Sequence, residues 1–234
     1  MNGGLALAML ETWPPEATVA VGPFLLRRAP GAGNRATCAT AAGAVGADDI
    51  AALARAARGL GQTPTVMLAD ADAALDAMLA AQGWRMGEGV VLYAAPLSAF
   101  APAPPPLTTF AVWPPLGIMR LIWAEDGTGP QKLRVMDRAG APKTAILART
   151  GDRAAGAAFV AVAQGVAFLH ALTVVPVLRR QGTARHILRA AAAWAQAQGA
   201  TRLALAVTVG NAPARALYAS FDMHEVGGYH YRIL

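Results

Sequence analysis

The segment 166–188 constrains the fold more than any other part of the chain, because it joins a buried strand to a helix through a short basic turn. Val166–Val175 is apolar at all but two positions, rich in β-branched residues and of strand length. Pro176 ends the strand, since proline cannot donate to a sheet ladder. Apolar residues then recur at helical spacing from Ile187 to Trp194. The segment therefore predicts a strand, a tight loop and a helix.

The loop of this unit is suited to an anion. A helix N-terminus carries unpaired N–H groups and a partial positive charge. Gly182 lets an anion approach the backbone without a Cβ in the way, and Ala184 is the next smallest choice. Arg179, Arg180 and Arg185 add full positive charges. The turn predicts a pyrophosphate site, although it matches neither the Walker A pattern nor G-x-G-x-x-G.

Two motifs of the chain resemble those of one enzyme family. Arg179-x-x-Gly182-x-Ala184 resembles the [Q/R]-x-x-G-x-[G/A] loop of the GNAT superfamily of N-acetyltransferases, which bind acetyl-CoA. Residues 211–218 read N-A-P-A-R-A-L-Y and resemble the N-x-x-A-x-x-L-Y segment of the same family. The alternative is an ordinary basic turn that caps a core helix. The resemblance implies an α/β (mixed α+β) fold with a central mixed sheet between helices.

The resemblance also implies roles for individual residues. The strand before the loop splays from its neighbour in this family, and the backbone N–H of Val174 would donate to the thioester oxygen. Tyr218 would protonate the leaving thiolate, or else only pack its helix on the sheet. Asn211 would contact the pantetheine arm, although helix capping alone explains an asparagine there. The implied cofactor-binding residues are Leu172, Thr173, Val174, Arg179, Arg180, Gln181, Gly182, Thr183, Ala184, Arg185, Asn211 and Tyr218.

The general base is the least defined part of this hypothesis. The expected strand 202–209 has no carboxylate, and Ala206 stands where some relatives carry glutamate. His170 is the best-placed titratable group, with a satisfied core histidine as the alternative. The remaining candidates either contact the acceptor or serve as solvated and packing residues. They are Glu125, Asp126, His224, Tyr229, His230 and Tyr231.

Composition limits the partners. The net charge is +6, and the arginines are scattered without a basic run or interleaved aromatics, which argues against nucleic-acid binding. A polyanionic cofactor is enough to account for the clustered arginines, and a compositional bias of the genome is the alternative. Cys38 is the single cysteine, which excludes an intramolecular disulfide and fits a reducing compartment. Residues 1–16 lack the basic start of a signal peptide, and no apolar run reaches the ~18 residues of a membrane span. We expect a cytoplasmic monomer or homodimer without membrane contact or metal.

The chain divides at a proline-rich connector. Residues 101–109 contain four prolines within six positions, which favours a stiff linker between halves 1–100 and 110–234. The halves resemble an imperfect repeat, because the helix expected at 72–82 parallels the one at 211–221. The first half has Asp48 and Asp49 in place of the arginine loop, so we interpret it as a smaller, degenerate GNAT-like half. Chance similarity of short amphipathic helices is the alternative.

Periodicity and turn residues predict the other elements. In the first half, strands are expected at Val19–Arg28 and Arg35–Thr40, joined by a turn over Ala29–Gly33. An entry helix is expected within 1–16. Further helices are expected at 50–60, 71–82, 116–124, 129–139 and 213–221, and further strands at 64–68, 90–94, 144–150, 156–163, 202–209 and 226–233.

The sequence thus favours an enzyme that moves an acetyl group from acetyl-CoA to a primary amine of a small molecule or peptide by direct transfer. A non-catalytic CoA-binding sensor or scaffold is the first alternative, because no carboxylate base is evident. An acyltransferase for a longer acyl group is the second.

Overall fold

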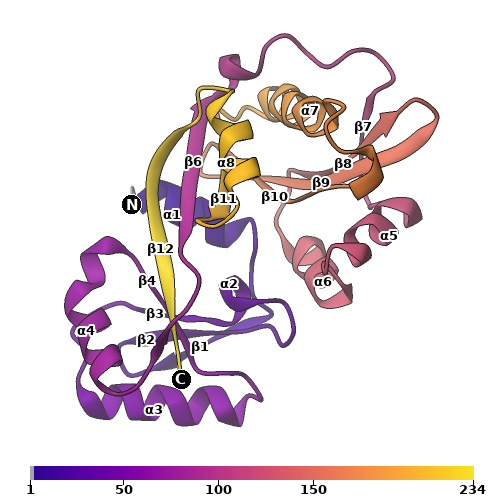
Figure 1. The fold of residues 1–234 in the computed structure, drawn as a ribbon. Helices are drawn as coiled ribbons and strands as arrows, with labels where there is room; N and C mark the ends of the chain where they lie inside the picture. Colours follow the sequence, from indigo (N-terminus) through magenta and orange to yellow (C-terminus); the bar gives the residue numbers. More distant parts are fainter. Residues whose placement is uncertain (1–2) are drawn as a thin grey trace.

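The computed structural model describes residues 3–234 as one mixed sheet with helices on both faces (Figure 1). Met1 and Asn2, which begin the predicted entry helix and first half, lie outside the described residues. Within residues 3–234 the sheet has 12 strands in the order β1-β2-β3-β4-β12-β6-β11-β10-β9-β8-β7, with β5 paired to β12. The mixed α/β fold predicted from the sequence is confirmed.

The elements of the first half are α1 (Gly3–Glu11), β1 (Ala17–Val21), β2 (Phe24–Arg28), α2 (Asn34–Thr37), β3 (Ala39–Ala41), α3 (Ala47–Gly59), β4 (Thr65–Leu68), α4 (Ala73–Ala81), β5 (Arg85–Met86) and β6 (Val90–Pro96). Those of the second half are β7 (Thr109–Val112), α5 (Gly117–Glu125), α6 (Pro130–Arg138), β8 (Lys143–Thr150), β9 (Arg153–Ala163), β10 (Val166–Val174), α7 (Thr183–Ala197), β11 (Arg202–Thr208), α8 (Ala212–Ala219) and β12 (His224–Ile233).

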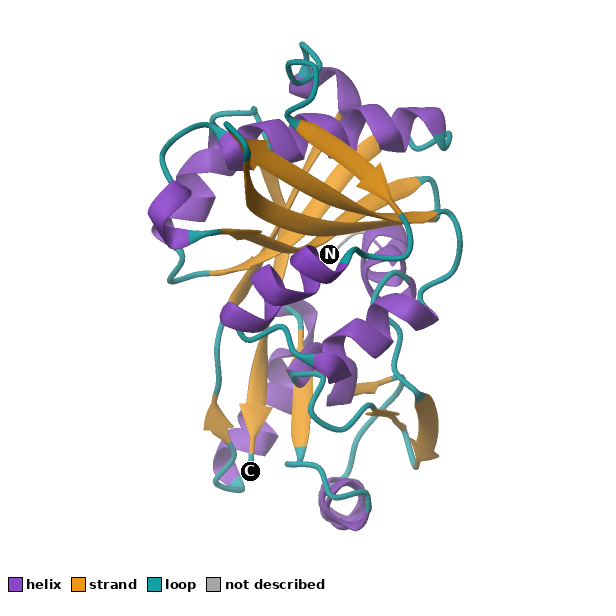
Figure 2. Ribbon diagram, turned by 90° about the vertical axis from the view of Figure 1, so that its right-hand side faces the viewer, coloured by secondary structure: helices purple, strands orange, loops and turns teal. Residues whose placement is uncertain are grey.

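The sheet of the second half is covered on both faces. Side chains alternate across a strand, so Ala158 and Val160 of β9 pack in the core under α7 and α8. Ala157 and Phe159 point the other way, into a core shared with α5 and α6. The N-terminal helix α1 also packs on β9 and β10 (Figure 2). A helix of the first half therefore helps to bury the sheet of the second.

Strands are also exchanged between the halves. β6 of the first half lies between β11 and β12. Its Tyr93 pairs with Leu205 of β11 on one side and with Glu225 of β12 on the other. β12 begins beside β6 and ends beside β4, where His230 pairs with Leu68 (Figure 1). One continuous sheet thus includes strands from both sides of the connector predicted at 101–109. The division into domains at that connector stays a prediction.

The last strand, β12, is held against the first half by a cluster of salt bridges. Arg232 of β12 donates to both carboxylate oxygens of Asp76 on α4, at 2.7 and 2.9 Å, and His230 lies 2.7 Å from the same carboxylate. The hydrogen bonds from Arg232, followed by that from His230, hold the pKa of Asp76 well below its usual 3.8. The cluster ties β12 to a helix 154 or more positions earlier in the chain.

The expectations for the start of the first half were wrong in two places. Val19–Arg28 is not one strand, because Gly22, with φ of +55°, and Pro23 turn the chain back and make β1 and β2 a hairpin. Arg35–Thr40 is not a strand either, because Asn34–Thr37 forms the short helix α2 before β3 begins at Ala39. The edge strand β7, over 109–112, was not predicted.

Candidate active site

The centre of the second half is a gap between two parallel strands. β10 and β11 pair only from Val166 with Arg202 to Leu169 with Leu205. Beyond that point β10 stays with β9 and β11 stays with β6. The facing edges of the two strands are therefore unpaired in the described structure, and backbone N–H and C=O groups there are open to a ligand.

A bulge in β10 marks the start of this gap. The register with β9 shifts between His170 and Thr173, and Ala171 has φ of +49°. A left-handed alanine is strained, and the backbone carbonyl of Ala171 is held by the indole N–H of Trp123 at 2.8 Å. The Thr173 hydroxyl next donates to the Asp126 carboxylate at 2.9 Å. The bent strand is thus fixed from the α5 side.

The backbone amide of Val174 points into the gap. The N–H of Val175 donates to the carbonyl of Ala155 on β9 at 2.9 Å. Successive residues of an antiparallel strand point their amides to opposite edges, so that of Val174 faces away from β9. This is the orientation that the predicted role of Val174 needs.

The loop after β10 leaves its amides free. Gly182 precedes α7 with φ of +83°, a conformation that favours glycine, and Arg180 has φ of +63°. Within the described chain, no amide from Arg180 to Arg185 donates to another backbone group or to a capping side chain. Three arginines surround this set of unpaired donors, which makes it a strong anion site.

A cavity of about 680 Å³ opens at this loop. All of the predicted cofactor-binding residues line it except Gln181 and Tyr218, and Asp126 and residues of α8 complete it. Arg179 donates from Nε to the Val174 carbonyl at 3.1 Å, and Arg185 donates to the Ser220 hydroxyl at 2.7 Å. The Arg185 guanidinium also lies 4.5 Å from the centre of the Phe221 ring. Thus two of the arginines are held near the loop before any ligand binds.

The two α8 residues singled out by the sequence differ in position. Asn211 lines the cavity and also caps α8, because its side-chain oxygen accepts from the Ala214 amide at 3.2 Å. Tyr218 is buried, with 7% of its surface exposed, and its ring lies 5.8 Å from that of Tyr93. Burial raises the pKa of Tyr218 to about 12, so the phenol keeps its proton at neutral pH.

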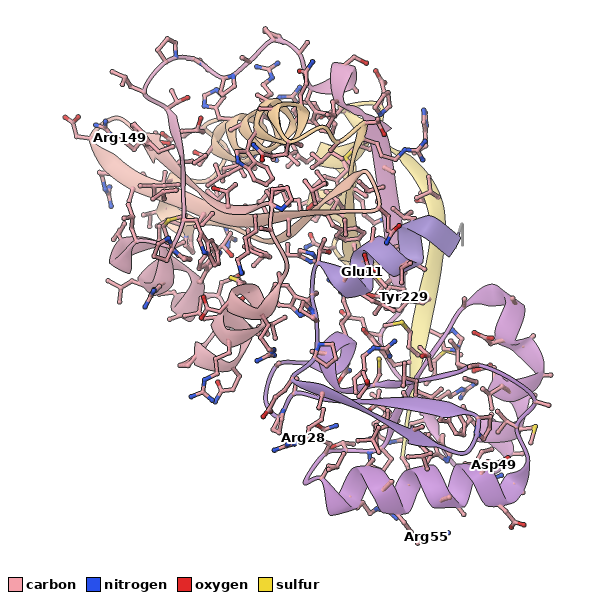
Figure 3. All side chains as sticks on the ribbon, turned by 180° about the vertical axis from the view of Figure 1, so that it is seen from behind. Glu11, Arg28, Asp49, Arg55, Arg149 and Tyr229 are labelled. Atoms are coloured by element: carbon pink, nitrogen blue, oxygen red, sulfur yellow. The ribbon has the colours of Figure 1, made fainter. Side chains whose placement is uncertain are left out.

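A second cavity, of about 310 Å³, lies on the other side of the gap, where the two halves meet. Ala206 and Thr208 of β11 line it together with His170 and Ala171 of β10. Tyr229 and Tyr231 line it from β12, and Figure 3 labels Tyr229 at this junction. Neither Glu125 nor His224 lines either cavity.

His170 has both ring nitrogens engaged. The Thr12 hydroxyl donates to the carbonyl of Ala8 at 2.7 Å, so its oxygen accepts from Nε2 of His170 at 2.9 Å. Nδ1 then carries the lone pair, which accepts from Arg35 at 3.2 Å. Burial, together with the Arg35 charge, holds the pKa of His170 well below 6.5. The role of His170 as a base stays a prediction, and its lone pair is already bound.

Three charged residues that sequence reasoning missed line this second cavity: Arg35, Glu88 and Lys132. Glu88 precedes β6, and Arg35 lies on α2, which was predicted as a strand. No local signal points to either, because only the placement of the first half beside β11 and β10 brings them to the gap.

Within residues 3–234, no cluster of His, Cys, Asp and Glu side chains is arranged to hold a metal ion. No helix in the same range has the length and apolar character needed to cross a membrane.

Comparison with known proteins places this geometry in context. Residues 116–223 match the acetyltransferase (GNAT) family. A GCN5-related N-acetyltransferase from Kribbella flavida aligns with a TM-score of 0.69 and 18% identity, over 98% of this chain and 93% of that one. A tandem GNAT protein from the clavulanic acid biosynthesis pathway aligns with a TM-score of 0.62 and 15% identity, over 95% and 84%.

A conserved protein of unknown function from Staphylococcus epidermidis aligns equally well, with a TM-score of 0.69 and 10% identity over 92% of each chain. No curated protein sequence shows a significant match. At these identities the likeness shows the fold. It extends over nearly the whole chain and includes a tandem protein, so the predicted tandem arrangement is confirmed.

Proposed function

The C-terminal half of this chain belongs to the acetyltransferase (GNAT) family, and from that premise we propose that it moves an acetyl group from acetyl-CoA to a primary amine of a small molecule or peptide. One observation carries the proposal. The unpaired amides that open α7, ringed by arginines, lie in the same 680 Å³ cavity as the free edge of β10. An anion site and an extended backbone edge are what a nucleotide with a long amide-bearing arm requires.

The residues of the larger cavity fit acetyl-CoA. The amides from Arg180 to Arg185 bind the pyrophosphate, and Arg179, Arg180 and Arg185 neutralise its charge. The unpaired backbone of Leu172–Val174 receives the pantetheine arm as a strand would. When bound, acetyl-CoA supplies an activated acetyl group as a thioester. The amide of Val174 donates to the thioester oxygen, where negative charge develops as the amine attacks.

The proton for the departing sulfur comes from Tyr218 in this proposal. Its phenol is protonated at neutral pH because burial raises its pKa to about 12. The amine approaches from the smaller cavity, since Ala206 and Ala171 border that cavity on the two strands that form the gap. The two substrates thus meet in the opening between β10 and β11, one from each side.

A specific observation also supports the non-catalytic alternative, in which the second half binds CoA as a sensor. Tyr218 is not among the residues that line the larger cavity, and the lone pair of His170 is bound by Arg35. An intact anion site without a working acid or base would bind the cofactor and release no thiol. Binding and turnover must therefore be measured separately.

The test is a thermal-unfolding titration with acetyl-CoA, followed by an assay of free thiol with a panel of amines. A ligand at 100 times its Kd stabilises the native state by about 2.7 kcal/mol, which is a rise of roughly 5–10 °C for a chain of this size. The controls are two kinds of nucleotide, one without the amino group of the base and one with a single phosphate. A melting temperature that stays constant at millimolar acetyl-CoA would falsify the proposal, and a shift without thiol release would favour the sensor.

A further inference from the structure

The smaller cavity carries an unbalanced pair of cations. Within the described side chains, no carboxylate forms an ion pair with Arg35 or with Lys132, although both line this cavity. The Lys132 ammonium donates to the carbonyl of Gly127 at 2.9 Å, which holds it beside the α5–α6 loop. Half-buried cations without a counterion are costly, so their persistence in a cavity points to an anionic ligand.

Arg35 is held in position by neutral partners. Its Nε donates to the Tyr229 hydroxyl at 3.2 Å, and Nη1 donates to Nδ1 of His170 at 3.2 Å. Burial raises the pKa of Tyr231 and of the Cys38 thiol, the nearby groups that lose a proton at high pH, so both stay uncharged at neutral pH. The positive charge of the Arg35 guanidinium is therefore not neutralised by these neighbours. The two hydrogen bonds fix its orientation, and Nη2 has no hydrogen-bond partner among the described residues, so it is available to a ligand.

Among the described residues, a single carboxylate lines the cavity. Glu88 is exposed and has no ion pair among the described residues. Its neighbour Gly89 accepts a hydrogen bond from the amide of Val209 at 2.9 Å, which fixes the Glu88 segment against the end of β11. Arg35 thus lies beside His170 of β10, and Glu88 lies in the segment that pairs with the end of β11, and both line the same cavity.

From this arrangement we infer that the acceptor is a small amine that also bears a carboxylate, such as a free amino acid. The inference rests on the proposed function. Arg35, with Lys132, binds the carboxylate, and Glu88 binds the ammonium group. The volume of about 310 Å³ is at the lower end of the range for ligand pockets, which fits a molecule of amino-acid size. The first half of the chain thereby supplies Arg35 and Glu88, two of the three charged groups that select the acceptor, and the second half supplies Lys132.

The same arrangement supplies the base that the second half lacks. The bound ammonium gives one proton to the Glu88 carboxylate, and the freed lone pair forms the C–N bond to the acetyl carbon. The C–S bond then breaks, Tyr218 gives its proton to the sulfur, and the nitrogen gives its second proton back to Tyr218. Glu88 returns its proton to water. The products are an N-acetyl amino acid, CoA and one proton.

The experiment compares each of the common amino acids with its own carboxamide, using the full chain and acetyl-CoA, and follows thiol release. The amide keeps the amine and removes only the negative charge. We expect kcat/KM for the preferred amino acid to exceed that of its carboxamide by at least ~30-fold, the effect of losing one partner of a hydrogen-bonded charge pair. Phosphoethanolamine carries an amine and a phosphate, so it tests whether Arg35 and Lys132 bind a phosphate instead of a carboxylate.

Two variants assign the roles. Arg35→Gln should raise KM for the amino acid by ~30-fold or more and leave KM for the carboxamide within about twofold. Glu88→Gln should lower kcat and shift the rate profile to higher pH, because only amine that is already neutral can then react. The controls are Arg28→Gln and Glu16→Gln, which remove an exposed pair of the same half with 3.8 Å between its charged atoms. Affinity for acetyl-CoA should stay unchanged in all four variants.

Each outcome bears on one proposal. Suppose that acetyl-CoA binds, but that carboxamides react as well as amino acids or that phosphoethanolamine is the one acceptor that reacts. The inference is then overturned and the acetyltransferase function stands. Binding of acetyl-CoA with no acetylation of any carboxylate-bearing amine also overturns it. If acetyl-CoA does not bind, both proposals fail. Should Arg35→Gln not fold, the amide comparison and Glu88→Gln still decide the question.

Discussion

The two halves of the molecule contain the same unit with opposite charge at its centre. In each half a strand leads into a helix and on to a parallel strand, as β3–α3–β4 in the first and β10–α7–β11 in the second. At the start of α3 the Gly46 amide donates to the Asp49 carboxylate at 2.9 Å. A Cβ on Gly22 would come within 2.8 Å of the same carboxylate, so Asp49 also fills the space beside the β1–β2 turn. Figure 3 labels Asp49 on this helix.

The start of α7 lacks such a carboxylate. Its first turn has no acidic residue, and the amides from Arg180 to Arg185 have no backbone or capping partner in the described chain. The difference teaches that any helix N-terminus attracts an anion, and that the sequence decides whether the protein supplies that anion itself. We therefore expect one acetyl-CoA per chain, bound by the second half. The first half contributes instead a strand, a helix and two charged residues of the smaller cavity, Arg35 and Glu88.

The largest difference between the halves should appear at Tyr218. Its position in α8 corresponds in the predicted repeat to Leu79 in α4, and both side chains are buried. Tyr218→Phe keeps the ring and removes the proton, so turnover should fall by about 100-fold, as is usual for a lost general acid. Affinity for acetyl-CoA should change less than threefold by this reasoning. Thiol release and calorimetric titration measure the two quantities.

The matched control is Tyr93→Phe, which removes a hydroxyl that donates to Glu225 at 2.7 Å in the same aromatic pair. Turnover should be nearly unchanged in that variant. If Tyr218→Phe retains wild-type turnover with a good acceptor, Tyr218 only packs its helix, as Leu79 does.

An intermediate effect is expected from charge reversal at the two helices. Arg180→Glu places a carboxylate at the proposed phosphate site, as Asp49 does in α3. Acetyl-CoA affinity should fall on the order of 30-fold, and less at high salt because exposed charges are screened. Arg55→Glu, an exposed arginine of α3 labelled in Figure 3, is the control and should bind normally. Equal affinity in Arg180→Glu and wild type would contradict the anion site.

The elements of both halves could be predicted where hydrophobic periodicity was strong. The strand 166–174 and the helix 183–197 follow their local patterns, and the loop between them was identified from its glycine and arginines. The segment 34–41 was misread, because α2 is a single turn of helix with one buried alanine and no periodicity to detect. The division of residues 17–28 depended on Gly22, which the continuous apolar runs on both sides concealed.

The charged residues of the smaller cavity, where we propose that the acceptor binds, could not be predicted for a different reason. Arg35 and Glu88 are local residues of the first half, and they reach the gap because β6 inserts between β11 and β12. That strand order joins segments more than 100 positions apart, and no spacing of residues along the chain encodes it. The proposed cofactor site is built around a contiguous loop, which the sequence could reveal, whereas the proposed acceptor site depends on how the halves exchange strands.

The smallest expected effect separates the two glycines that precede the helices. Gly182 has φ of +83°, where a side chain costs about 1–2 kcal/mol, whereas Gly46 has φ of −102°, which any residue adopts. Gly182→Ala should therefore lower the free energy of unfolding by about 1–2 kcal/mol and also weaken acetyl-CoA binding, since a Cβ stands beside the amides. Gly46→Ala should cost less, about 0.5–1 kcal/mol for alanine in place of glycine at an N-cap, and leave binding intact, because its Cβ would lie at an ordinary 3.5 Å from Asp49. Urea unfolding with and without acetyl-CoA measures both, and equal losses in the two variants would mean that the backbone before α7 is no more specialised than that before α3.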